Sequence, residues 1–145
     1  MSIIEFKNTS KHFGPLKVLD GVDLSIETGE VVVLVGPSGS GKSTLLRCIN
    51  GLETITSGDL VVDGLSVTGG KRQLREIRQE AGMVFQQFNL FPQLTALENV
   101  AFGPSKVRGL SREKAREAAL DLLEKVGLRE KADHYPAELS GGQQQ

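Results

Sequence analysis

The chain has 145 residues, 39% of them hydrophobic and 24% charged, with a formal net charge of -1 at pH 7. This length and composition predict an ordinary globular domain with one buried core. The near-neutral charge disfavours nucleic acid as a partner, because proteins that bind the phosphate backbone carry a basic excess. No apolar run approaches the ~20 residues of a membrane span, and the amino end shows no signal-peptide pattern. Cys48 is the single cysteine, which fits a reducing cytosol.

The first part of the chain predicts strands. Residues 3–6 and 18–26 alternate like half-buried strands on either side of the turn signal Gly14-Pro15, so we expect an antiparallel hairpin. Val31 to Val35 is an uninterrupted aliphatic run, typical of a strand covered on both faces in a parallel sheet. Without its flanking strands, such a run would leave a long apolar edge that promotes aggregation.

A helix and a further strand follow. The helix is expected from Lys42 to Asn50, with Gly51 as its end and Cys48 packed behind it as a small apolar residue. Residues 58–62 predict a short strand that stops at the turn signal Asp63-Gly64.

The second half of the chain predicts mainly helices. Residues 71–80 form a charged helix, and their interleaved acidic residues favour a solvated face over a nucleic-acid patch. Met83 to Phe85 predicts a short apolar strand, and Thr95 with Glu98 has the spacing of a capping box that starts a helix. The strongest helical pattern runs from Ser111 to Val126. Its expected apolar face consists of Ala115, Ala118, Ala119, Leu122, Leu123 and Val126.

A glycine-rich loop joins the aliphatic run to the first helix and matches G-x-x-x-x-G-K-[ST] at every fixed position. A buried strand before it and a helix after it are the context that this phosphate-binding motif requires. Glycines let successive backbone N–H groups point inward at phosphate oxygens, and the helix adds its positive end. The loop consists of Gly36, Pro37, Ser38, Gly39, Ser40, Gly41, Lys42, Ser43 and Thr44.

Three side chains of this loop are candidates for direct contact with a nucleotide. Lys42 is expected to reach the β- and γ-phosphates, and the Ser43 hydroxyl to hold Mg²⁺. Thr44 can donate a further hydrogen bond. The chain lacks the N-K-x-D motif that recognises guanine, so we expect ATP rather than GTP.

A second motif, Leu139-Ser140-Gly141-Gly142-Gln143, lies about a hundred residues after the phosphate loop. It resembles the signature of ABC-type ATPases, and nearly the whole chain is similar to their ATP-binding domain. The resemblance implies an α/β fold with a P-loop NTPase core, an antiparallel β subdomain and a helical subdomain. It implies that residues of about 3–85 form the β subdomain with the phosphate loop, and about 86–140 the helical subdomain, of a domain spanning 3–145.

The resemblance also assigns roles to residues outside the phosphate loop. Val84-Phe85-Gln86 resembles the loop whose glutamine senses the γ-phosphate and the metal, which makes Gln86 a candidate catalytic residue and Mg²⁺ ligand. Phe13 occupies the position of the aromatic residue that stacks on adenine, although it could also simply cap the hairpin.

The signature motif implies a partner subunit. Ser140 and Gln143 have the spacing of a capping box, and exposed N–H groups at Gly141 and Gly142 would form a second anion site. In the family, Ser140, Gly141, Gly142 and Gln143 would contact ATP bound to the other subunit, within a head-to-tail dimer. A helix of only about three residues here should not hold helical form by itself.

Several segments are similar to ATP-binding subunits of polar amino acid importers. They include Phe88 to Pro92, Leu94 to Val100, Lys106 to Gly109 and the extension Gln144-Gln145, although phosphate importers share that extension. The resemblance implies membrane permease subunits as partners, an extracytoplasmic solute-binding protein indirectly, and a peripheral position on the cytoplasmic face of the cell membrane. The cofactors implied are ATP and Mg²⁺. No nucleic acid is expected as a partner.

The family's catalytic glutamate and its neighbouring aspartate lie beyond the signature motif. We therefore expect the complete protein to be an ABC-type ATPase, and this chain to be an unstable fragment, incomplete on its C-terminal side, that does not hydrolyse ATP. A non-catalytic nucleotide-binding module is the alternative. An ABC-type ATPase of DNA repair or translation is disfavoured, because those proteins usually carry long insertions or a basic surface.

Overall fold

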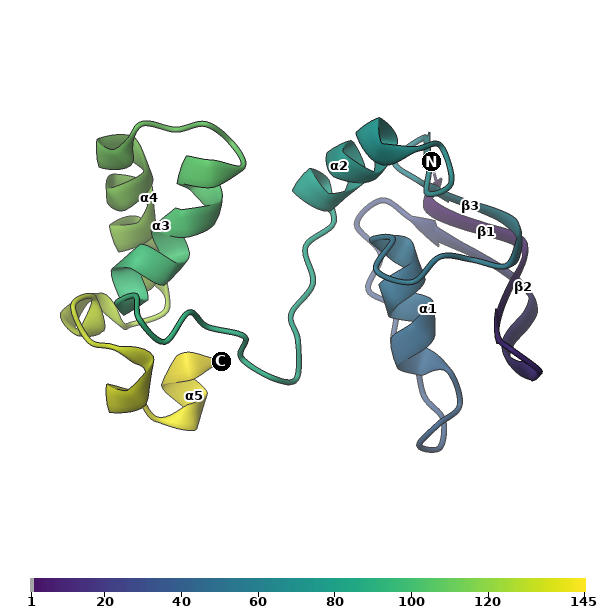
Figure 1. Cartoon of the computed structure of the whole chain (residues 1–145), viewed down its shortest axis with the longest axis horizontal. Helices are drawn as coiled ribbons and strands as arrows, with labels where there is room; N and C mark the ends of the chain where they lie inside the picture. The colour runs from purple at the N-terminus through teal and green to yellow at the C-terminus, as the bar shows by residue number, and fades with distance from the viewer. Residues whose placement is uncertain (1) are drawn as a thin grey trace. The chain divides into compact units, whose positions relative to one another are not determined.

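The computed structural model describes residues 2–145. Two compact units divide the chain: the first ends at Met83, and the second runs from Val84 to Gln145 (Figure 1). Each unit has its own hydrophobic core. Among the described residues, no helix combines the length and the apolar character needed to cross a membrane.

The first unit is built on an antiparallel sheet with the strand order β2-β1-β3-β4. β1 (Ser2–Phe13) and β2 (Leu16–Glu27) form the expected hairpin around the turn at residues 14–15. β3 (Ser57–Val62) pairs with the other edge of β1, and the short β4 (Leu65–Ser66) follows. Asp63 and Gly64 have φ of 47° and 74°, so both central residues of the β3–β4 turn are left-handed. The predicted hairpin of β1 and β2 and the predicted turn at Asp63-Gly64 after β3 are thus confirmed.

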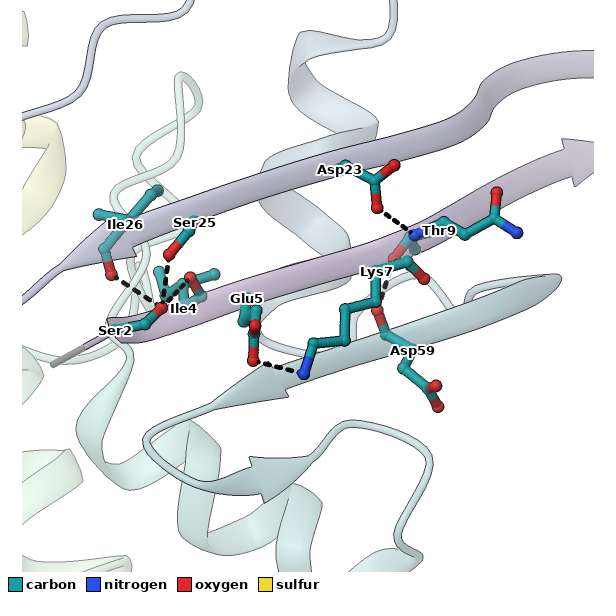
Figure 2. A network of polar contacts seen from close by, with 10 residues as sticks. Ser2, Ile4, Glu5, Lys7, Thr9, Asp23, Ser25, Ile26 and Asp59 are labelled. Atoms are coloured by element: carbon teal, nitrogen blue, oxygen red, sulfur yellow. Dashed lines mark hydrogen bonds and ion pairs between the residues drawn. The ribbon is translucent and has the colours of Figure 1, made fainter.

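Polar contacts bridge the places where the strand pairing is irregular (Figure 2). The register of β1 shifts on both sides, between Phe6 and Thr9 against β2 and between Lys7 and Ser10 against β3. The buried hydroxyl of Thr9 donates to the carbonyl oxygen of Asp59 at 2.5 Å, and the amide of Asn8 donates to Oδ1 of Asp23 at 2.7 Å. These side chains satisfy backbone groups that the interrupted ladders leave open.

Two helices pack against the sheet. α2 (Lys71–Glu80) has the expected boundaries, and α1 (Lys42–Ile49) ends one residue before the expected Asn50. Each contributes a fully buried side chain, Cys48 and Ile77. Burial raises the pKa of the Cys48 thiol, while Lys11 nearby opposes the rise and Glu53 adds to it. Cys48 is thus the small apolar core residue that was expected. The buried core of this unit consists of Phe6, Leu19, Cys48, Ile55, Leu60, Val62, Val67 and Ile77.

Two strands expected from aliphatic runs are not formed, and both predictions were wrong for this chain. Val31 to Val35 has no strand assignment, and the exposed fractions of Val31, Val33 and Val35 are 90%, 76% and 90%. Met83 to Phe85 likewise has no strand assignment. The physical reason is that a strand needs a partner for its N–H and C=O groups, and residues 2–145 supply none for either run.

The second unit is helical. α3 (Ala96–Lys106) and α4 (Arg112–Lys125) pack on each other, followed by the 3-10 turns η1 (Arg129–Lys131) and η2 (Pro136–Glu138) and by α5 (Gly141–Gln144). The capping box predicted for Thr95 and Glu98 is present at the start of α3. The amides of Ala96 and Leu97 donate to carbonyls of the segment after α4, those of His134 and Ala132. The buried core of this unit consists of Leu97, Ala119, Leu123 and Ala132.

The apolar face of α4 is narrower than the sequence pattern predicts. Ala115, Ala119 and Leu123 are buried, whereas Leu122 is 47% exposed and Val126 is 68% exposed. The prediction was therefore wrong for these two residues. A single neighbouring helix, with the turn η1, covers only a narrow stripe of α4, so the flank of the apolar face stays in solvent.

Asn99 fixes the loop that precedes α3. Its Oδ1 accepts from the amide of Phe91 at 2.8 Å, and its Nδ2 donates to the carbonyl oxygens of Phe91, Leu94 and Thr95 at 3.1, 3.0 and 3.0 Å. One amide side chain thereby satisfies four backbone groups of a segment that has no regular structure of its own.

Candidate nucleotide-binding site

The glycine-rich loop enters α1 through Gly41, at a position where only glycine fits. Its φ is 88°, in the left-handed region, and a Cβ at this position would lie 2.9 Å from the carbonyl oxygen of Val18 on β2. The backbone of the loop therefore approaches the hairpin at a distance that any larger residue would prevent.

The start of α1 keeps backbone donors available. No side chain caps this helix, so the N–H groups of its first turn have no capping partner. Together with the positive end of the helix dipole, such groups form a binding site for an anion. Lys42 begins the helix, and the exposed Ser43 and half-exposed Thr44 follow in the same turn.

The ammonium group of Lys42 is hydrogen-bonded to the glycine-rich loop that precedes it. Nζ donates to the carbonyl oxygens of Gly36 and Pro37 at 2.8 and 2.7 Å, and to the hydroxyl of Ser40 at 3.3 Å. These contacts close the loop into a ring around the lysine. Phosphate oxygens carry more negative charge than these acceptors and would bind the ammonium more strongly.

Phe13 and the loop line one cavity of about 680 Å³. Phe13 is at the end of β1, the residue is 45% exposed, and it lines this cavity together with the loop. The structure thus brings together the aromatic residue and the phosphate loop. The residues lining the cavity are Phe13, Leu16, Val18, Ser38, Gly39, Ser40, Gly41, Lys42, Ser43 and Thr44.

Leu16 and Val18 line this cavity and were not expected there. Leu16 pairs with Phe13 across the hairpin, and Val18 is on the same strand two residues further on. The period-2 alternation of a strand places both on one face, so the hairpin register was the signal that could have identified them.

Gln86 and the signature residues belong to the second unit. Gln86 is exposed in the segment that leads to α3. Ser140 caps α5: its hydroxyl accepts from the amide of Gln143 at 3.4 Å, and Oε1 of Gln143 accepts from the amide of Ser140 at 2.9 Å. Gly141 and Gly142 are exposed, and a Cβ at Gly141 would lie 3.8 Å from the Phe88 ring.

The expectation that this short helix would not form was wrong. Besides the capping box, Nε2 of Gln144 donates to the carbonyl oxygens of Pro136 and Leu139 at 2.9 and 3.0 Å. Side chains therefore supply hydrogen bonds that four residues of helix cannot supply by themselves.

A metal ion would depend on the nucleotide for most of its ligands. Within residues 2–145, no cluster of three or more His, Cys, Asp or Glu side chains could hold a cation. The hydroxyl of Ser43 is nevertheless exposed on the cavity. Mg²⁺ commonly binds through one or two protein groups together with waters and substrate phosphates, so the residues present fit this ion.

The comparisons with known proteins show the family to which the chain belongs. A family model described as ABC transporter matches residues 19–145. The chain belongs to the ABC transporter family, as its motifs indicated.

The relatives that match this chain include transport ATP-binding proteins. The chain is 71% identical over 143 residues to the glutamine transport ATP-binding protein GlnQ of Escherichia coli, covering 99% of this chain and 60% of the relative. It is 54% identical to the protein of the same name from Bacillus subtilis, over 99% of this chain and 59% of the relative. The glutamate transport ATP-binding protein GluA of Corynebacterium glutamicum is 50% identical, with the same coverage of 99% and 59%. The chain thus spans about 60% of the length of these relatives.

Solved structures confirm the predicted fold class. The ATP-binding cassette MJ0796, in a dimeric post-hydrolysis state bound to ADP and Pi, superposes with a TM-score of 0.86 at 42% identity. The superposition covers 97% of this chain and 65% of the cassette. An antiparallel sheet and a helical unit of an ABC cassette are therefore present here.

Proposed function

We propose that the chain binds MgATP in the cavity between Phe13 and the loop of residues 36–44. The observation that carries this proposal is the shared cavity, which has an aromatic ring on one side and an uncapped helix start with Lys42 on the other. Adenine would stack on Phe13, and the triphosphate would lie along the loop. Lys42 would exchange its loop acceptors for β- and γ-phosphate oxygens.

Mg²⁺ would be held by the Ser43 hydroxyl, by the phosphates and by Gln86 of the second unit. The ion would neutralise charge between the β- and γ-phosphates when bound. The Ser43 hydroxyl faces the cavity, which supports its part, whereas the part of Gln86 rests on the resemblance of Val84-Phe85-Gln86 to the family motif.

We also propose that these residues bind ATP without hydrolysing it. No Asp or Glu is among the described residues that line the cavity. We expect the chain to retain ATP without turning it over, and the complete protein to be the ATPase.

The proposed role of the complete protein is to power the import of polar amino acids. Support comes from the relatives, which are named for the transport of glutamine and glutamate. Membrane permease subunits would be the direct partners, at the cytoplasmic face of the membrane, and an extracytoplasmic solute-binding protein would act indirectly.

A second ATP-binding subunit would complete the site. Ser140, Gly141, Gly142 and Gln143 would contact the γ-phosphate of ATP on the other subunit of a head-to-tail dimer. The exposure of both glycines supports this proposal, because their backbone can approach a ligand closely. The related cassette MJ0796 has been solved as a dimer.

The segment before α3 would contact the permease. The cluster of Phe88, Leu90, Phe91, Leu94 and Leu97 would serve partly as core and partly as a groove that receives a permease helix. Leu97 is fully buried, while Phe88 and Phe91 are 42% and 41% exposed. Phe91 also contacts Phe102, with ring centroids 4.8 Å apart. Exposed aromatic rings held by a fixed loop suit a protein partner.

Calorimetric titration tests the nucleotide site directly. We expect the chain to bind MgATP, and Lys42→Met to weaken that binding by about 10- to 100-fold, since a charge-assisted contact is lost. Lys125→Met removes the same charge from α4 in the second unit and should leave the affinity unchanged. Failure of the chain to bind MgATP, or equal affinity of the two variants, would contradict the proposal.

A further inference from the structure

The ammonium group of Lys11 lies over the ring of Phe13. Nζ is 4.5 Å from the ring centroid, within the range of an attractive cation–π contact. The same nitrogen is 3.2 Å from Oε2 of Glu53 and donates to the carbonyl oxygen of Thr54 at 2.8 Å. The exposed fractions of the Lys11 and Glu53 side chains are only 12% and 27%, so three contacts hold a lysine that is largely out of solvent.

Strand geometry explains why lysine and ring meet. Lys11 and Phe13 are two residues apart on β1 and therefore project from the same face of the strand. Phe13 lines the nucleotide cavity, whereas Lys11 is not one of the described residues that do so. The cation thus contacts the ring without lining the cavity, and Phe13 as a residue remains 45% exposed, which leaves surface for a second contact.

The partners of Lys11 also connect the ring to the phosphate-binding helix. The amide of Glu53 donates to the carbonyl oxygen of Arg47 at 3.0 Å, in the last turn of α1. The phosphate loop leads into the first turn of the same helix. Lys11 therefore joins the hairpin that carries Phe13 to the helix that carries Lys42, through Glu53.

We infer that Lys11 is a positioning residue for nucleobase binding, which holds the Phe13 ring in the orientation in which a base stacks on it. The inference rests on the proposed ATP site and adds a residue to it. A ring that is already held loses less freedom when a base binds, so more of the stacking energy appears as affinity. The effect is confined to the base, because Lys11 does not line the part of the cavity that surrounds the phosphates.

A tryptophan reporter makes the base contact measurable. The chain contains no tryptophan, so Phe13→Trp introduces a single indole at the ring position. We expect MgATP to change its emission, and magnesium tripolyphosphate, which has the phosphates without the base, to bind without that change. Calorimetry on the unaltered chain, which retains Phe13, then measures the affinities for MgATP and for magnesium tripolyphosphate without the reporter.

Lys11→Met is the decisive variant. We expect it to raise the Kd for MgATP about 3- to 10-fold, as for the loss of one cation–π contact, and to leave the Kd for magnesium tripolyphosphate unchanged. Lys11→Arg should restore the affinity to within about 2-fold, because guanidinium also stacks on rings. Lys17→Met is the matched control, since it removes an exposed lysine paired with Asp20 from the same hairpin.

The outcomes separate this inference from the proposed function. Equal weakening of MgATP and tripolyphosphate by Lys11→Met, or no weakening of either, overturns the role of Lys11. Absence of MgATP binding by the unaltered chain instead overturns the proposed function. If Lys11→Met does not fold, Glu53→Gln, which loosens the anchor and leaves the lysine, is expected to give the same base-dependent loss at about 2-fold.

Discussion

The two units start their helices in opposite ways. In the first unit, α1 and α2 begin after Gly41 and Gly70, both with positive φ, and neither has a side-chain cap. In the second unit, Thr95, Ser111 and Ser140 each accept a hydrogen bond from the backbone of the helix that follows. The second unit satisfies its helix starts from its own side chains, whereas the first leaves donors unused.

The difference indicates two roles for a helix start: the side-chain caps of the second unit stabilise their helices, whereas the uncapped start of α1 suits a bound anion. A hydroxyl cap contributes about 1 kcal/mol to a helix, and a glycine cap contributes less through its backbone alone. At α1 the uncapped donors face the cavity, where an anion would take the place of the cap. Changes at Gly41 should therefore act on binding, and changes at the capping hydroxyls on stability.

The largest effect is expected for Gly41→Ala. Positive φ and the approach to the Val18 carbonyl oxygen should cost about 2–3 kcal/mol of unfolding free energy and eliminate measurable MgATP binding. Chemical denaturation and calorimetry give both quantities. Gly127→Ala is the control, since its φ of 71° is equally unfavourable but no atom lies within 4 Å of the added Cβ. A variant at Gly41 that binds normally would remove the distinction between the two kinds of helix start.

Thr95→Ala should have the next largest effect. Loss of the hydroxyl removes half of the capping box of α3 and should destabilise the second unit by about 1 kcal/mol. Hydrogen exchange of the α3 and α4 amides measures this change, and the affinity for MgATP should stay the same. Weaker nucleotide binding in this variant would contradict the assignment of the Thr95 cap to stability alone.

Ser140→Ala should have a smaller and local effect. α5 has only four residues, so loss of its cap should speed exchange of the Gln143 amide about 5-fold and leave global unfolding unchanged. Binding of MgATP by a single chain should also be unchanged, because the proposed ligand of this segment belongs to another subunit. A changed affinity in the monomer would contradict action in trans.

The smallest effect is expected from pH, at the buried side of α1. The pKa of Cys48 is raised above its ordinary value of 9.0 by burial, so the folded chain holds the thiol proton more tightly than the unfolded chain. This stabilisation is fully present below pH 9.0 and is lost as the pH rises through the folded pKa. Denaturation of the chain and of Cys48→Ala between pH 8 and 10.5 should show a steeper decline for the unaltered chain, and parallel declines would contradict it.

The sequence predicted those elements whose determinants are local. The hairpin around Gly14 and the capping box formed by Thr95 and Glu98 depend on turn and capping residues close together in the chain. The helix at residues 71–80 was predicted from its own pattern of charges. The aliphatic run from Val31 to Val35 failed because a buried strand depends on partners far away in sequence, and these residues have none here.

Within the candidate site, the loop was predictable and its surroundings were not. The motif around Lys42 is contiguous, so its residues could be named from spacing alone. The anchoring of Lys11 beside Phe13 depends on Glu53 and Thr54, which are far away in sequence, and no local pattern shows that these two residues lie beside β1. The exposure of Leu122 depended in the same way on how wide a surface the neighbouring helix covers.

The unpaired run from Val31 to Val35 also makes the chain open to limited proteolysis. Proteases bind extended backbone with free N–H and C=O groups, and an elastase-type enzyme prefers small aliphatic side chains such as these. A cut there would break the covalent connection between the hairpin that carries Phe13 and the loop that carries Lys42. Non-covalent contacts, such as the pairing of β1 with β3, would then hold the two sides of the nucleotide cavity together. Any strand that pairs with this run in a larger assembly would remove the cleavage site.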